Sequence, residues 1–225
     1  MCKEGVVEMD SQKYVIEVSH INKSFKGVQV LKDISLHCES GKIYGLVGHN
    51  GSGKTVLFKI ICGFVSCDSG TVSVNGKVMG KDKDILTEAG IIIEDPGFLR
   101  TWSAYHNLEF LYTLRNKKNK KYLYSILNKV GLDPKLKRPV GKYSLGMRQR
   151  LALAQAIMEE PEILILDEPM NGLDKNGVKE IRELLLDMKK ENKLIILASH
   201  NREDIEILCD EVYEMDGGMI YKMKR

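Results

Sequence analysis

The sequence has no long hydrophobic run: no segment approaches the roughly eighteen uninterrupted apolar residues that a membrane-spanning helix needs. The first ten residues, MCKEGVVEMD, also lack the apolar core of a signal peptide, so Cys2 is not in the setting of a lipoprotein cysteine. If the protein works at a membrane, we therefore expect another chain to hold it there.

Cysteine is scarce, and the excess of one charge over the other is small. The five cysteines show neither a CxxC pair nor the Cys/His spacing of a metal site, which favours reduced thiols. The 34 basic and 31 acidic residues leave a net charge of +3, from which no general affinity for nucleic acid or anionic membranes follows. The basic run RNKKNKKY at 115–122 could grip phosphates, but its small width favours a solvated connection between helices.

Short β-branched runs alternate with helical patterns along most of the chain. The segments 14–18 and 34–38 flank a turn near Lys26-Gly27, which predicts an antiparallel ribbon. Segment 42–48 predicts an apolar strand that enters a glycine-rich loop, and the residues that follow are helical in pattern. Segment 70–77 predicts a further strand with an Asn-Gly turn.

Three later runs are continuously apolar, as in strands that are covered on both faces of a parallel sheet: 89–93, 162–166 and 193–199. Between Asn176 and Asn192 the apolar residues follow one face of a helix. The alternation predicts one α/β domain with a parallel core sheet, formed by residues 1–95 and 161–225. Residues 96–160 show helical spacing without a convincing strand and predict an inserted helical subdomain.

The segment GHNGSGKT at 48–55 matches the phosphate-binding pattern G-x-x-x-x-G-K-[ST] after a predicted strand and before a predicted helix. Its glycines allow backbone N–H groups to turn toward phosphate oxygens, and the following helix adds the positive end of its dipole. Lys54 offers a point charge for the β and γ phosphates, and Thr55 offers a hydroxyl for Mg²⁺. A chance glycine turn would not need the strand, lysine and helix in this order.

Two adjacent acids end the buried strand ILIL at 163–166. Asp167 stands at the carboxyl end of that strand, where open α/β sheets bind ligands, and can hold the Mg²⁺ shell. Glu168 points the other way if the strand remains extended, and can then address a water as a general base. Two such acids alone would more often mark a solvated turn; together with the phosphate loop they indicate a nucleotide hydrolase.

A second glycine-marked helix start, YSLGMRQR at 143–150, lies between those two motifs. Ser144 can cap the helix that follows, which is the ordinary role of a serine in this position. The same serine hydroxyl, together with Gly146 and the positive helix end, could instead approach a phosphate. The chain alone leaves both interpretations open.

With these motifs in this order, the chain resembles the ATP-binding subunit of an ABC transporter over nearly its whole length. Six segments carry the resemblance, in chain order: Phe25 as the adenine-stacking aromatic, Gly48 to Thr55 as the Walker A loop, Ser144 to Gln149 as the signature, Asp167 and Glu168 as the Walker B pair, 171–174 as the D-loop, and His200 as the switch histidine.

The resemblance implies a role for each of these residues. ATP with Mg²⁺ would bind to Phe25 and to Gly48, His49, Asn50, Gly51, Ser52, Gly53, Lys54, Thr55 and Val56. Lys54, Glu168 and His200 would be catalytic, and Thr55, Asp167 and Glu94 would address the metal. Ser144, Leu145, Gly146, Met147, Arg148 and Gln149 would face the ATP held by a second subunit, with Asp174 in the D-loop. An aromatic on a ribbon can also serve packing alone, so both interpretations of Phe25 stay open.

Three residues depart from the family pattern. Met147 stands where the signature has its second glycine, and Val56 stands where serine or threonine is usual after Thr55. Glu94 occupies the position of the glutamine that reaches Mg²⁺ and contacts the permease. A glutamate followed by proline and an aromatic resembles the subgroup that exports bacitracin or lantibiotic-type peptides.

The resemblance implies a P-loop ATPase with a RecA-like core that powers a separate membrane permease at the cytoplasmic face of a membrane. Its partners would be that permease and a second ATPase subunit, identical or paired, without nucleic acid. A non-transport ABC ATPase acting on ribosomes or DNA is the alternative, but such relatives join two cassettes or carry long coiled coils. A P-loop kinase would explain neither the signature nor His200.

Overall fold

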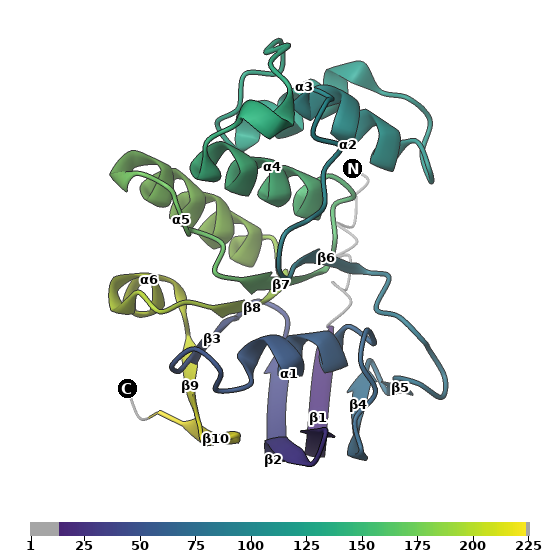
Figure 1. Cartoon of the computed structure of the whole chain (residues 1–225), viewed down its shortest axis with the longest axis vertical. Coiled ribbons are helices and arrows are strands. Elements are labelled where there is room, and N and C mark those ends of the chain that lie inside the picture. The colour runs from purple at the N-terminus through teal and green to yellow at the C-terminus, as the bar shows by residue number, and fades with distance from the viewer. Residues whose placement is uncertain (1–13, 224–225) are drawn as a thin grey trace, which may run out of the picture.

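Two β-sheets and a layer of helices organise residues 14–223, the part of the chain that the computed structural model describes (Figure 1). The prediction about the first ten residues and Cys2 lies outside this range. The four cysteines inside it have free thiols: Cys38, Cys62, Cys67 and Cys209. No helix among the described residues is long and apolar enough to cross a membrane.

The smaller sheet is antiparallel, with the strand order β2-β1-β4-β5. Its strands are β1 (Val15–Phe25), β2 (Val28–Glu39), β4 (Ser69–Val74) and β5 (Lys77–Val78). Lys26 and Gly27 join β1 to β2 with φ angles of 47° and 83°, the left-handed pair that a tight two-residue hairpin needs. The predicted ribbon, and the Asn75-Gly76 turn between β4 and β5, are confirmed.

The larger sheet has the order β10-β9-β3-β8-β7-β6, and every neighbouring pair in it is parallel except β9 with β10. Its strands are β3 (Ile43–Val47), β6 (Ala89–Ile92), β7 (Ile163–Asp167), β8 (Leu194–Ala198), β9 (Glu211–Asp216) and β10 (Met219–Lys222). The four apolar runs predicted as strands form β3, β6, β7 and β8. Strands β9 and β10 were not predicted from the sequence.

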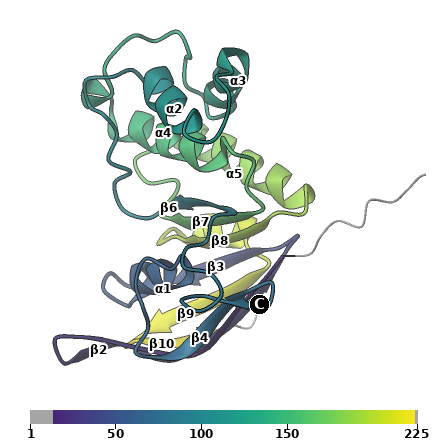
Figure 2. The same cartoon turned by 90° about the vertical axis from the view of Figure 1, so that its right-hand side faces the viewer.

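Alternating side chains on the central strands enter two different cores. Ile163 and Ile165 of β7 join a core with the antiparallel sheet and helix α1 (Lys54–Ile61), which lies between the two sheets (Figure 2). Leu164 and Leu166 join a core on the opposite face with the helices above the sheet. All four side chains are fully buried, which explains why the strand reads as an unbroken apolar run.

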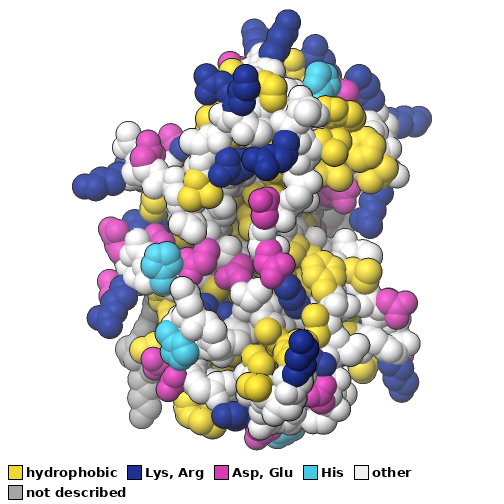
Figure 3. All heavy atoms as spheres, in the orientation of Figure 1, with side chains coloured by type: hydrophobic (Ala, Val, Ile, Leu, Met, Phe, Trp, Pro, Cys, Tyr) yellow, Lys and Arg dark blue, Asp and Glu magenta, His cyan; other side chains and the backbone are white. Residues whose placement is uncertain are grey.

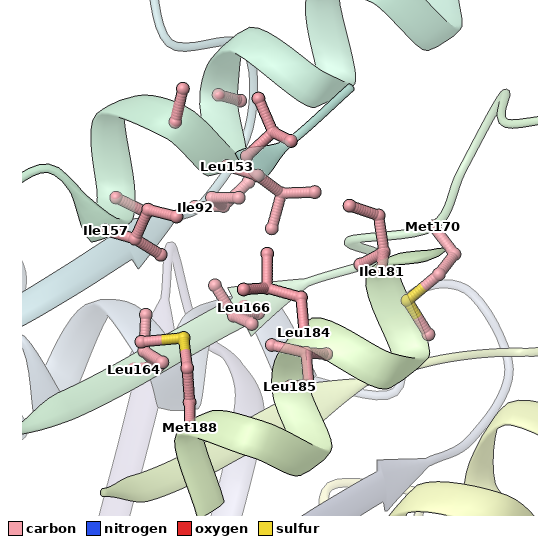
Figure 4. Packing of buried hydrophobic residues seen from close by; sticks show 14 of the residues in the cluster. Ile92, Leu153, Ile157, Leu164, Leu166, Met170, Ile181, Leu184, Leu185 and Met188 are labelled. Carbon is pink, nitrogen blue, oxygen red and sulfur yellow. The ribbon is translucent and has the colours of Figure 1, made fainter. Parts of the chain in front are cut away.

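The second core is built mainly from two helices that lie across the sheet. Leu153 and Ile157 of α4 (Leu145–Ile157) meet Ile181 and Leu185 of α5 (Lys175–Lys190) above β7 (Figure 4). Burying a side chain of this size contributes about 1.5–3 kcal/mol, so this contact fixes α4 firmly against the sheet.

Four shorter helices complete the elements of residues 14–223: α2 (Ala104–Tyr112), α3 (Lys120–Lys129), the 3₁₀ turn η1 (Val140–Lys142) and α6 (Arg202–Leu208). Residues 96–160 contain helices and no strand, as expected. Since α4 packs on β6 as well as on α3, a boundary at residue 160 remains a prediction.

The parallel strands β3, β7 and β8 lie side by side, so their carboxyl ends meet at one edge of the sheet. The loops that leave this edge contain residues 48–53, 168–174 and 199–201. This arrangement brings segments from the two ends of the sequence to one place.

Candidate active site

A cavity of about 580 Å³ opens at this edge of the sheet. Its lining comes from the loop after β3, the start of α1, the ends of β6 and β7, and α4. The lining residues are Val30, Asn50, Gly51, Ser52, Gly53, Lys54, Thr55, Val56, Ile92, Glu94, Gln149, Asp167, Glu168 and Asn171.

The start of α1 presents free backbone donors to this cavity. Of the six α-helices in the described residues, α1 is the one without a side-chain hydrogen bond at its N-terminus. Its cap is Gly53, with φ 105°, and a Cβ there would lie 2.7 Å from Cδ2 of Leu31. The first N–H groups of a helix have no partner within the helix, so this end is suited to an anion.

Lys54 is 8% exposed, and its ammonium group is held by the loop itself. Its Nζ donates to the carbonyl oxygens of Gly48 at 2.8 Å and His49 at 3.2 Å. An ammonium group has three donors and carries its charge at one point, so Lys54 can keep a loop contact while it meets a phosphate oxygen.

The hydroxyl of Thr55 donates to Oδ2 of Asp167 at 2.6 Å. This contact joins the first turn of α1 to the end of β7, which are 112 residues apart in sequence. A hydroxyl and a carboxylate are hard oxygen donors of the kind that Mg²⁺ binds, usually together with waters and substrate phosphates. The two residues therefore fit a magnesium ion that arrives with a nucleotide.

Glu168, which lines the cavity, forms a second polar pair with His200, which is not among the lining residues. The ring nitrogen Nδ1 of His200 lies 2.8 Å from Oε2 of Glu168, and the backbone N–H of His200 donates to the same oxygen at 3.4 Å. Since an ionised carboxylate only accepts hydrogen bonds, Nδ1 is the donor in this contact. The pair holds the Glu168 carboxylate in one orientation.

The backbone at Glu168 differs from the expectation that the strand continues. Strand β7 ends at Asp167, and Glu168 has a left-handed φ of 51°. The alternation of side chains along a strand therefore does not apply, and both acids line the same cavity. The backbone N–H of Glu168 donates to the carbonyl of Ala198 at 3.0 Å, and this hydrogen bond holds the turn in place.

Glu94 lines the cavity, but its carboxylate has a partner that the sequence did not indicate. Nζ of Lys59, one turn along α1 from Thr55, lies 2.6 Å from Oε1 of Glu94. Glu94 has a φ of 64°, and its side chain is 64% exposed. The metal role of Glu94 remains a prediction, and Lys59 is the residue that would compete with a metal for it.

The start of α4 shows one of the two roles considered for Ser144, and the approach to a phosphate remains a prediction. Ser144 caps α4, and its Oγ accepts a hydrogen bond from the N–H of Met147 at 3.2 Å. The segment Leu145–Gln149 forms the first turn of the helix. Gly146 is needed within this chain, because a Cβ there would lie 2.7 Å from the carbonyl oxygen of Gly172.

The side chain of Gln149 reaches the site of its own chain. Its Nε2 donates to the carbonyl of Glu168 at 3.2 Å, and the residue lines the cavity. This contact assigns at least one residue of the signature to its own subunit in this structure. Ser144, Leu145, Gly146, Met147 and Arg148 are not among the lining residues.

Three further predicted residues are not among the residues that line the cavity. Phe25 is 44% exposed at the end of β1, and Nζ of Lys23 lies 5.1 Å from its ring centre. The residue of the β1–β2 ribbon that lines the cavity is Val30. The His49 ring faces Asp216 at 3.2 Å. Asp174 caps α5 and accepts from the N–H of Gly177 at 2.8 Å.

Sequence reasoning missed Asn171 and Val30, which line the cavity, and Lys59, which pairs with Glu94. Asn171 belongs to the segment 171–174 that was identified as the D-loop, so the sequence did contain a signal for it. Nothing in the sequence around Lys59 distinguishes it from other surface lysines.

Comparisons with known proteins agree with this geometry. The family model described as ABC transporter matches residues 31–171. The chain is 41% identical over 208 residues to the bacitracin transport ATP-binding protein BcrA of Enterococcus faecalis, covering 92% of this chain and 68% of the relative. It is 37% identical over 210 residues to the lantibiotic transport ATP-binding protein SrtF of Streptococcus pyogenes, covering 93% and 88%.

A solved structure of the ATP-binding cassette MJ0796, a dimer bound to ADP and phosphate, has the same fold. The TM-score is 0.82 at 18% sequence identity, and the match covers 93% of this chain and 99% of the other.

Proposed function

The chain belongs to the ABC transporter family as an ATP-hydrolysing subunit, and we propose that it cleaves Mg-ATP in the cavity at the start of α1 to power a separate membrane permease. The observation that carries this proposal is the contact of 2.6 Å between Thr55 and Asp167 beside the uncapped helix. It places two oxygen groups suited to Mg²⁺ beside a helix end suited to an anion.

In this proposal the phosphates bind to the loop 48–55. The free N–H groups of α1 and the ammonium of Lys54 stabilise their negative charge, and Thr55 and Asp167 hold the ion. When bound, Mg²⁺ neutralises charge on the β and γ phosphates.

Glu168 is the general base in this proposal. It accepts a proton from the water that attacks the γ-phosphate, and His200 keeps the receiving carboxylate oriented by donating from Nδ1. The imidazole Nε2 remains available to the phosphate or the water. Because hydrolysis needs no covalent intermediate, positioning and charge account for the catalytic contribution of these residues.

The site is completed by a second ATPase subunit in this proposal. Ser144 and the positive end of α4 lie outside the cavity of their own chain, which leaves them free to contact the nucleotide of another copy. Gln149 contacts Glu168 within its own chain, and so links the signature helix of each subunit to its own catalytic glutamate.

We propose that the cargo is an antimicrobial peptide or a drug, exported by a permease that this chain serves at the inner face of the cell membrane. The support is the identity to relatives named for bacitracin and lantibiotic transport, together with Glu94. The test is co-expression with a candidate membrane permease, followed by measurement of peptide resistance. Resistance that depends on Lys54 supports the proposal, and equal resistance with Lys54→Ala contradicts it.

A further inference from the structure

Two buried polar residues flank the exposed histidine at the end of β8. Ser199 is 3% exposed, and Asp204, in the first turn of α6, is 2% exposed. The side chain of His200, which lies between them in sequence, is 71% exposed. Figure 3 shows His side chains at the surface of the molecule, next to Asp and Glu side chains. The ring of His200 therefore projects from a turn that is anchored in the interior.

The hydroxyl of Ser199 holds the turn that carries His200. Its Oγ accepts a hydrogen bond from the backbone N–H of Asn201 at 3.1 Å, which closes a turn with His200 at its centre. The side chain of Asn201 caps α6 by accepting from the N–H of Glu203 at 3.0 Å. The turn is thus fixed at both ends, and the N–H of His200 donates to Oε2 of Glu168 at 3.4 Å.

The carboxylate of Asp204 fixes the direction of that hydroxyl. The Ser199 hydroxyl donates to Oδ2 of Asp204 at 3.2 Å. The other oxygen, Oδ1, accepts from Nε and from a terminal nitrogen of Arg182 at 2.8 Å and 2.5 Å. Arg182 lies on α5, and its side chain is 12% exposed. Because a guanidinium presents its donors in a rigid plane, this double contact orients the carboxylate that receives the hydroxyl hydrogen bond.

Stability alone is a weak explanation for this arrangement. A buried ion pair contributes little when it is compared with apolar side chains of the same volume, so an apolar contact would join α5 to α6 equally well. The contacts instead form one series that begins at Arg182 and ends at the backbone of His200. Neither Ser199 nor Asp204 lines the cavity of about 580 Å³. An effect on the reaction must therefore pass through the His200 turn.

We propose that Asp204 is a positioning residue for ATP hydrolysis. Through the hydroxyl of Ser199 it holds the His200 turn, and with it the Glu168 carboxylate, in the orientation that accepts the proton of the attacking water. This inference rests on the proposed function, in which Glu168 is the general base. A displacement of a reacting group by about 1 Å can cost about 10²-fold in rate, so loss of the hydroxyl should be measurable in hydrolysis.

Ser199→Ala removes the hydroxyl with the least other change to the turn. Single-turnover hydrolysis at saturating Mg-ATP should slow at least about tenfold, because the base is no longer held in one orientation. The dissociation constant of the nucleotide should stay within about twofold of the wild type, because Ser199 does not line the cavity. A general loss of structure would change both quantities.

Ser40→Ala is the matched control for a buried serine that has two hydrogen bonds. Ser40 is 8% exposed, its Oγ donates to the carbonyl of Tyr14 at 3.2 Å, and it accepts from the N–H of Tyr14 at 2.7 Å. Ser40 precedes β3 and so lies at the edge of the sheet opposite to the cavity. This variant should lower the urea midpoint as Ser199→Ala does, without slowing hydrolysis.

Two double-mutant cycles separate positioning from a structural role. In the Glu168→Gln background the base is absent, so Ser199→Ala should change the residual hydrolysis rate by less than about twofold. Asp204→Asn keeps one acceptor oxygen for two sets of donors and should slow hydrolysis by itself, but not further in the Ser199→Ala background. If Asp204→Asn does not fold, the first cycle and the Ser40→Ala control still test the proposal.

Three results would overturn the proposal. The first is hydrolysis by Ser199→Ala at the wild-type rate. The second is equal slowing by Ser199→Ala and Ser40→Ala. The third is a slowing by Ser199→Ala that persists in the Glu168→Gln background, since the hydroxyl would then act independently of the base. Failure of the proposed function is distinct: Glu168→Gln itself would hydrolyse ATP at the wild-type rate, which would overturn this inference together with that function.

Discussion

His200 and Glu168 are joined through two nitrogens of the histidine, which lie 2.8 Å and 3.4 Å from the same carboxylate oxygen. His200 comes from the loop after β8 and Glu168 from the turn after β7. Because the backbone N–H takes part, the main chain as well as the ring fixes this carboxylate. A glutamate held in this way is oriented before any substrate arrives.

Glu168→Gln should slow ATP hydrolysis by about 10²–10⁴-fold, the usual loss when a general base is removed. The amide keeps the size of the side chain and can still accept from His200, so nucleotide affinity should change little. Single-turnover hydrolysis and nucleotide titration of the same preparation measure the two quantities. Loss of binding in parallel with turnover would mean that Glu168 has a structural role.

Thr55→Val should abolish the magnesium dependence of nucleotide binding, because valine keeps the branched shape of threonine without its hydroxyl. Thr55→Ser is the matched control, since it keeps the oxygen that contacts Asp167. Titrating a fluorescent ATP analogue with and without Mg²⁺ makes the comparison. If Val and Ser variants show the same magnesium effect, the pair does not hold the ion.

Glu94→Gln should retain nucleotide binding and change the Mg²⁺ concentration needed for hydrolysis, because it removes a charge that Lys59 now neutralises at 2.6 Å. Lys59→Met should lower the Mg²⁺ concentration needed for hydrolysis, since it leaves the Glu94 carboxylate free to meet the metal. Activity measured against Mg²⁺ for both variants is the test. Identical curves for both variants and the wild type would leave Glu94 as a surface acid.

Asp204→Ala should destabilise the fold by about 1–3 kcal/mol, the usual cost of leaving buried hydrogen-bond donors without their acceptor. Asp204 is 2% exposed and accepts from Arg182 at 2.5 Å and 2.8 Å and from the hydroxyl of Ser199, next to His200. Hydrogen bonds from Arg182 to Glu203 and Asp204 raise the pKa of the guanidinium. Glu203→Ala, at an exposed position, should destabilise the fold much less, because solvent screens the ion pair that it removes. The free energy of unfolding in urea measures both effects. An equal decrease for Asp204→Ala and Glu203→Ala would contradict the prediction.

Sequence reasoning succeeded where the signal is local. Ile163–Leu166 is apolar without interruption because its two sets of side chains enter different cores, and that predicts a central strand. The phosphate loop likewise carries its requirements in eight consecutive residues. The hairpin of β9 and β10 was missed, although Gly217-Gly218 between two short runs of mixed residues was a usable turn signal.

The remaining differences depend on contacts between distant segments. Lys59 and Glu94 are 35 residues apart, and Gln149 and Glu168 are 19 apart, so no local pattern encodes either contact. The left-handed turn at Glu168 follows from its hydrogen bond to Ala198 on the neighbouring strand. These contacts determine the partner of each side chain, and the spacing of apolar residues in the sequence does not specify such partners.

The central claim is that Ser144 at the start of α4 completes the nucleotide site of a second copy. Gly146→Asp is a poor test, because it would also collide with the carbonyl of Gly172 in its own chain. Ser144→Asp avoids this problem, since aspartate caps a helix as well as serine does and adds only negative charge. Ser144→Asn is the matched control, because it caps the helix without that charge.

The decisive measurement is the mass of Glu168→Gln in solution with Mg-ATP, by analytical ultracentrifugation, alone and combined with each substitution of Ser144. The account predicts a dimer for Glu168→Gln and for its combination with Ser144→Asn. It predicts a monomer that still binds ATP for the combination with Ser144→Asp, because the added carboxylate repels the γ-phosphate of the other copy. A dimer in all three proteins, or a monomer in all three at saturating Mg-ATP, would contradict it.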